Sequence, residues 1–113
     1  MDEQEWMELA AKAAGLYVCR DASVIGVTEF GIDLWVKEEK FGTYRAWNPL
    51  DDDGDAFRLA MSLDMTVNCN RDSLTVIVQS WRPKLCKAVR GNENNEDVRR
   101  AIVEVAAMIG KLL

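Results

Sequence analysis

Four aspartates and one glycine lie together in the stretch of this chain that could most readily do chemistry. The stretch runs Asp51-Asp52-Asp53-Gly54-Asp55. Carboxylate oxygens are the ligands that Ca²⁺ and Mg²⁺ prefer, so a cation site is one interpretation. An EF-hand loop needs its glycine sixth and a glutamate twelfth. With Gly54 sixth, the loop would start at Pro49 and end at Ala60, which has no ligating group.

The same aspartates also have a structural explanation. Asn48-Pro49 is a turn signal, because proline fixes its own φ and disfavours the helical region for the residue before it. Asp51 or Asp52 can then be the N-cap of a helix, accepting hydrogen bonds from backbone N–H groups without helical partners. The remaining acids lie at the positive end of the helix dipole. We therefore predict a helix cap formed by Asn48, Pro49 and residues 51–55, with no metal and no cofactor.

A second group of residues mixes cations with an aromatic ring. It consists of Trp81, Arg82, Lys84, Lys87 and Arg90. Such a surface can contact phosphates and stack on bases. The net charge of −5 and the small number of cations argue against nucleic acid, since attraction grows with each phosphate neutralised. We keep nucleic-acid binding as an alternative and expect protein contacts here.

Aromatic residues on the predicted strands raise a related question. Exposed rings would indicate a protein-binding or dimer surface, whereas rings on strands usually pack in the core. Trp35 shares its strand face with Asp33 and Lys37, which favours a face that is only partly covered. The candidate protein-contact residues are Trp35, Trp47, Trp81, Arg82, Lys84, Lys87 and Arg90. The expected partner is another protein or a second copy of the chain.

Several classes of enzyme are excluded by composition. The chain has no histidine, which removes Ser-His-Asp and Cys-His catalysis and most zinc and non-haem iron sites within one chain. Its three cysteines are an odd number without CxxC spacing, so we expect no disulfide framework. Acids and lysines alone can transfer protons, but no pair is positioned by the sequence. We predict a protein without catalytic residues, and metal-dependent activity at residues 51–55 stays an alternative.

The elements that position these residues follow from hydrophobic periodicity. Residues 2–14 place Trp6, Leu9, Ala10 and Ala13 on one helical face, and Gly15 ends the helix. Period-two patterns predict strands over residues 17–20, 24–28, 32–37, 43–47 and 66–70. Residues 74–80 are rich in β-branched residues and predict a further strand, and residues 85–89 are one more strand candidate. Asn94 or Asn95 caps a last helix, whose apolar stripe includes Ile102, Val105 and Ile109.

The helix after the Asn48-Pro49 turn is apolar over most of its circumference. Only Arg58, Ser62 and Asp64 interrupt the apolar residues between 56 and 65. Helices with so narrow a polar stripe are usually buried against more than one neighbour, so we predict that this is the central helix. The order of elements predicts one layered α+β domain over residues 1–113, with a mainly antiparallel sheet.

The cellular compartment of the protein is predicted from two features that the sequence lacks, a membrane span and a signal peptide. No apolar run approaches the roughly 20 residues of a membrane span. The N-terminal residues Met1 to Glu5 are acidic, the opposite of a signal peptide. We therefore expect an intracellular protein with no membrane contact.

Three segments together resemble the phage ABA sandwich domain family, small proteins of unknown function carried by bacteriophages and prophages. The segments run from Leu9 to Gly15, from Trp47 to Ala60 and from Arg99 to Gly110, and they cover about a third of the chain. Residues 17–45 and 66–95 match no family pattern. The resemblance implies layers of helices and sheet and an accessory protein in the bacterial host cytoplasm. It supplies no catalytic residues.

Overall fold

The structure is a computed structural model that describes residues 3–18, 34–38, 43–70, 75–81, 84–90 and 95–113. Within these ranges the elements are α1 (Glu3–Ala13), β1 (Tyr17–Val18), β2 (Leu34–Lys37), β3 (Arg45–Trp47), α2 (Asp53–Ser62), β4 (Thr66–Asn70), β5 (Thr75–Trp81), β6 (Lys84–Arg90) and α3 (Asn95–Leu112). An α+β architecture with the predicted order of elements is confirmed. The candidate strand at residues 24–28 lies outside the described ranges.

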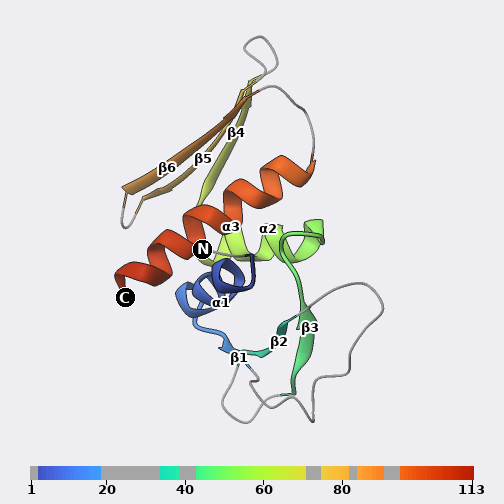
Figure 1. Cartoon of the computed structure of the whole chain (residues 1–113). Helices are drawn as coiled ribbons and strands as arrows, with labels where there is room; N and C mark the ends of the chain where they lie inside the picture. Colours follow the sequence, from blue (N-terminus) through green and yellow to red (C-terminus); the bar gives the residue numbers. More distant parts are fainter. Residues whose placement is uncertain (1–2, 19–33, 39–42, 71–74, 82–83, 91–94) are drawn as a thin grey trace.

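The described strands form two separate three-stranded antiparallel sheets, and the helices lie between them (Figure 1). In the first sheet β2 pairs with β1 and β3, which places Leu34 opposite Trp47. In the second sheet β5 pairs with β4 and β6, so that Val78 lies between Val67 and Lys87. α1 contacts the first sheet and α3 contacts the second. The fold is therefore layered, with a helical middle.

The most enclosed helix is α3. It contacts α1, α2, β5 and β6, which surround it on several sides (Figure 1). Its buried residues are Ala101, Ile102, Val103, Val105, Ala106, Ala107, Ile109 and Gly110. Many of these are small, which lets neighbouring elements approach the helix axis closely. None of the described helices is long and apolar enough to cross a membrane.

The prediction that α2 is the central helix is wrong. Its inner face is buried through Ala56, Leu59 and Ala60, but Phe57 is 65% exposed and Met61 is 62% exposed. α2 packs mainly on α3, and among the described elements no second neighbour covers its outer face. A narrow polar stripe therefore indicated an exposed apolar surface here, and not a helix enclosed on all sides.

Both ends of α2 are fixed by local hydrogen bonds. Asp52 is the N-cap, with extended φ and ψ of −114° and 119°, and its Oδ2 accepts from the amide of Asp55 at 2.8 Å. This selects one of the two predicted candidates. At the other end Asp64 adopts a left-handed φ of 52°. The chain then reverses, and the amide of Met65 donates to the carbonyl of Ala60 at 2.9 Å.

α1 ends at Gly15, as predicted. Gly15 has a φ of +75°, which glycine adopts without strain, and the amide of Leu16 donates to the carbonyl of Ala11 at 2.9 Å. The buried face of α1 is centred on Met7, Ala10 and Ala11. This face is rotated from the predicted one, and it includes two small residues on the helix that packs closely on α3, where Gly110 lies against the backbone of Leu9.

Candidate protein-binding surface

The acidic cluster at the start of α2 is a hydrogen-bonded structural unit. Asp55 is 7% exposed. Its Oδ2 accepts from the amide of Asn48 at 3.0 Å, and its Oδ1 accepts from Arg58 at 2.8 Å and from Arg45 at 3.4 Å. Asp55 thus joins β3, the turn before α2 and α2 itself. Its hydrogen bond also raises the pKa of the Arg58 guanidinium above its ordinary value.

The other members of the cluster also have partners. Asp51 accepts from the side-chain amide of Asn48 at 3.0 Å, and Asp53 accepts from Arg99 of α3 at 2.6 Å. Pro49 is fully buried beside them. In the described part of the chain, no three potential metal-ligating side chains come together. The described side chains also contain no buried nitrogen or oxygen without a hydrogen-bond partner.

Sequence reasoning missed the role of Asp55, which it treated as one of several acids at the positive end of the helix dipole. The three-residue spacing of Asp55 and Arg58 was a signal that these side chains pair along one helix face. The contact with Arg45 had no local signal, since it depends on how β3 lies beside α2. The contact of Arg99 with Asp53 joins residues that are 46 positions apart.

The basic Trp81–Arg90 stretch does not form one surface. Trp81 is 54% exposed, and its indole N–H donates to the hydroxyl of Thr66 at 2.9 Å. Lys84 is exposed and lies directly opposite Trp81 on the neighbouring strand, so both side chains are on the same face of the sheet. Lys87 instead faces α3, where its ammonium lies 2.9 Å from a carboxylate oxygen of Glu104. Arg82 lies outside the described residues, and the side chain of Arg90 is not described.

The two tryptophans of the first sheet differ in burial. Trp47 is 2% exposed and belongs to the core, so the interpretation of this residue as a protein contact is wrong. It is buried because it faces the helices, as does the fully buried Val36 on the neighbouring strand. Trp35 is half-buried on the opposite face of β2, and it remains a contact candidate.

An apolar groove lies between α2 and α3, and sequence reasoning did not identify it. It has a volume of about 780 Å³. We call it the α2–α3 groove, and it is lined by Asp53, Gly54, Ala56, Phe57, Ala60, Met61, Met65, Val67, Val98, Arg99 and Ile102. Most of these side chains are apolar. The charged ones, Asp53 and Arg99, bind each other at one end.

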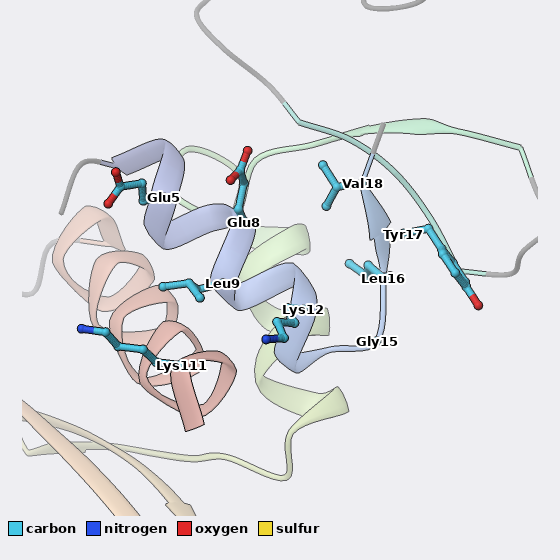
Figure 2. A pocket seen from close by; sticks show the side chains of 9 residues that line it. All are labelled: Glu5, Glu8, Leu9, Lys12, Gly15, Leu16, Tyr17, Val18 and Lys111. Carbon is cyan, nitrogen blue, oxygen red and sulfur yellow. The ribbon is translucent and has the colours of Figure 1, made fainter. Parts of the chain in front are cut away.

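A second hollow of about 830 Å³ lies between α1, β1 and the C-terminal part of α3 (Figure 2). Leu16 and Val18 point toward α1, whereas the ring of Tyr17 points away. The charged residues around it are Glu5, Glu8, Lys12 and Lys111, two acids and two bases. Because this charge is balanced and the charged groups are spread along the rim, the hollow favours no ligand class.

Comparison of the chain with protein-family models, with curated proteins and with solved structures gave no match. The resemblance to the phage ABA sandwich family therefore stays a prediction from the residues that carry it.

Proposed function

We propose that this chain is a small, non-enzymatic accessory protein of a phage or prophage that acts by binding another protein in the bacterial cytoplasm. The observation that carries the protein-binding role is the α2–α3 groove. Large contiguous apolar surfaces are rare on proteins that bind nothing, and they usually mark interaction sites. The phage origin and the compartment rest on the sequence resemblance.

The side chains at the mouth of the groove support this proposal. Burying a phenylalanine or a methionine stabilises a protein by roughly 1.5–3 kcal/mol. Phe57 and Met61 contribute little of this stability in the isolated chain, because both side chains are mostly exposed. A stable α2 needs only its inner face, with Ala56, Leu59 and Ala60. Polar residues at positions 57 and 61 would serve the fold equally well, so the apolar pair is better explained by contact with a partner.

The outer face of the second sheet supports binding less well. It exposes Trp81 and Ile77, but Thr66, Asn68 and Lys84 surround them with polar groups. The nucleic-acid alternative is also weakened, because Lys87 is paired with Glu104 on the opposite face. The groove therefore offers the most continuous apolar contact.

Photo-cross-linking in the cell tests the protein-binding role. Benzoylphenylalanine replaces Phe57 in the groove, Trp81 on the second sheet, or Tyr17 on β1, which is also well exposed. We expect a discrete protein adduct from position 57 and none from position 17. An adduct from position 81 alone would move the binding surface to the second sheet. No protein adduct from either position 57 or position 81 would contradict the proposal.

A further inference from the structure

The charges around the α2–α3 groove indicate which kind of segment it fits. We propose that the groove binds a basic amphipathic helix of a partner protein. The apolar face of that helix packs on Phe57 and Met61, and its lysines or arginines lie at the acidic end of the groove. This inference rests on the proposed function and adds the chemistry of the partner.

The shape of the groove suits a helix. Ala56, Ala60 and Ile102 are buried and line its depth, while the exposed Phe57 and Met61 line its mouth. Four-residue steps separate Ala56 from Ala60 and Phe57 from Met61 on α2, and Val98 from Ile102 on α3. The ten residues of α2 extend about 15 Å at 1.5 Å per residue, and a partner helix with apolar residues at i, i+4 and i+7 spans about 10 Å. A partner of two to three turns would therefore cover the groove.

Acidic residues lie beside one end of the groove, at the start of α2 and of α3. Asp51 and Asp52 precede α2, Asp53 lines the groove, and Asp97 lies in the first turn of α3. Arg99 offsets one of these charges by its ion pair with Asp53, and Arg58 approaches Asp52 at 3.9 Å. Each helix N-terminus adds only about half a positive charge. The end of the groove stays net negative, which favours lysine or arginine on the partner.

The same charges disfavour a second copy of this chain in the groove. A two-fold contact of α2 through Phe57 and Met61 would bring Asp52 and Asp53 of one copy toward Asp64 of the other. The chain as a whole carries a net charge of −5, so approach of a second copy is opposed at long range as well. A basic partner would meet neither the repulsion between aspartates nor the long-range repulsion between two negatively charged chains.

Peptide titration tests this inference. The probe is a fluorescein-labelled helical 16-residue peptide with leucine at i, i+3, i+4 and i+7 and lysine at the flanking positions. Its matched control has glutamate in place of each lysine. We expect the basic peptide to bind with a dissociation constant on the order of 10–100 µM and the acidic peptide at least about tenfold more weakly. Fluorescence anisotropy measures both.

Variants of the exposed residues locate the binding. Phe57→Ser and Met61→Ser should each weaken the basic peptide about tenfold, since each removes an apolar anchor. Asp53→Asn should weaken it about threefold at low salt and less at high salt, because this term is electrostatic. Trp81→Ser changes a comparably exposed aromatic on another face, and it should leave binding unchanged. Circular dichroism verifies that each variant is folded.

Several results would overturn the inference. The inference is wrong if the two peptides bind equally well or if the basic peptide does not bind at millimolar concentration. It is also wrong if the Phe57→Ser variant binds the basic peptide as tightly as the original chain does. A dimer in sedimentation that Phe57→Ser dissociates would assign the groove to a second copy. If no peptide binds while position 57 still cross-links to a cellular protein, the partner chemistry is wrong and the proposed function stands.

Discussion

Replacing Gly110 with alanine should destabilise the protein by about 2 kcal/mol. A Cβ built on Gly110 of α3 would overlap the carbonyl oxygen of Leu9 on α1 and lie 2.8 Å from its carbonyl carbon. These are backbone atoms, so α1 and α3 must move apart along their contact. Overpacking of this kind costs up to about 3 kcal/mol, and the better helix propensity of alanine returns about 1 kcal/mol. Urea unfolding followed by circular dichroism measures the difference.

Gly54→Ala is the matched control for this prediction. A Cβ at Gly54 meets only the ends of flexible side chains, at 3.2 Å from Asp52 and 3.3 Å from Arg58. We expect a change within about 0.5 kcal/mol of the original stability, or a small gain from helix propensity. If Gly110→Ala is as stable as Gly54→Ala, the close approach of α1 and α3 is wrong.

Replacing Asp55 with alanine should also destabilise the protein, by about 2 kcal/mol. The substitution leaves the partly buried amide of Asn48 without its acceptor, and such groups cost about 1–3 kcal/mol. It also removes the link from Arg45 to α2. The guanidinium groups lose less, because both are partly exposed and can be solvated. Chemical unfolding of the variant measures the loss.

Two variants separate this effect from ordinary charge removal. Glu38 also binds Arg45, at 3.3 Å, but its side chain is 70% exposed, so Glu38→Ala should change stability by less than about 0.5 kcal/mol. Asp52→Ala removes the N-cap and should cost about 1 kcal/mol. An Asp55→Ala protein as stable as Glu38→Ala would show that Asp55 does not join these elements.

Much of the fold could be predicted because its signals are local. Proline before α2, a cap aspartate and the glycine after α1 each act within a few residues, so the order of elements and several boundaries followed from them. Strand positions in the second sheet also followed from local signals, alternation in residues 66–70 and β-branched residues in 74–80. The division into two sheets did not, since strand pairing is determined by contacts between distant parts of the chain.

The burial of individual side chains was harder to predict. Phe57 and Ala56 are adjacent in an apolar helix, yet one is exposed and the other buried, because only one face of α2 meets α3. Trp47 and Trp81 are both aromatic residues on strands, yet Trp47 is buried and Trp81 is exposed, because Trp47 faces the helices and Trp81 lies on the outer face of its sheet. Small residues were the better guide to the central helix, since the alanines and Gly110 of α3 allow close packing.

The candidate surface was therefore only partly predictable. A protein-binding role was predicted from the sequence, where no catalytic pattern was recognised, but the predicted contacts were placed on the strands. The groove arises from the side-by-side packing of α2 and α3. In the sequence, 32 residues lie between the end of α2 at Ser62 and the start of α3 at Asn95. The hydrophobic pattern within either helix does not indicate that the other helix packs beside it.

Methionine oxidation tests the open face of α2 most directly. Met61 is 62% exposed at the mouth of the groove, whereas Met7 is 4% exposed on the buried face of α1. In dilute hydrogen peroxide, followed by peptide mass spectrometry, we expect Met61 to oxidise at least about tenfold faster than Met7, since oxidation follows exposure. In urea the two rates should converge. Equal protection of Met61 and Met7 in the folded protein would contradict the exposed groove and the binding role built on it.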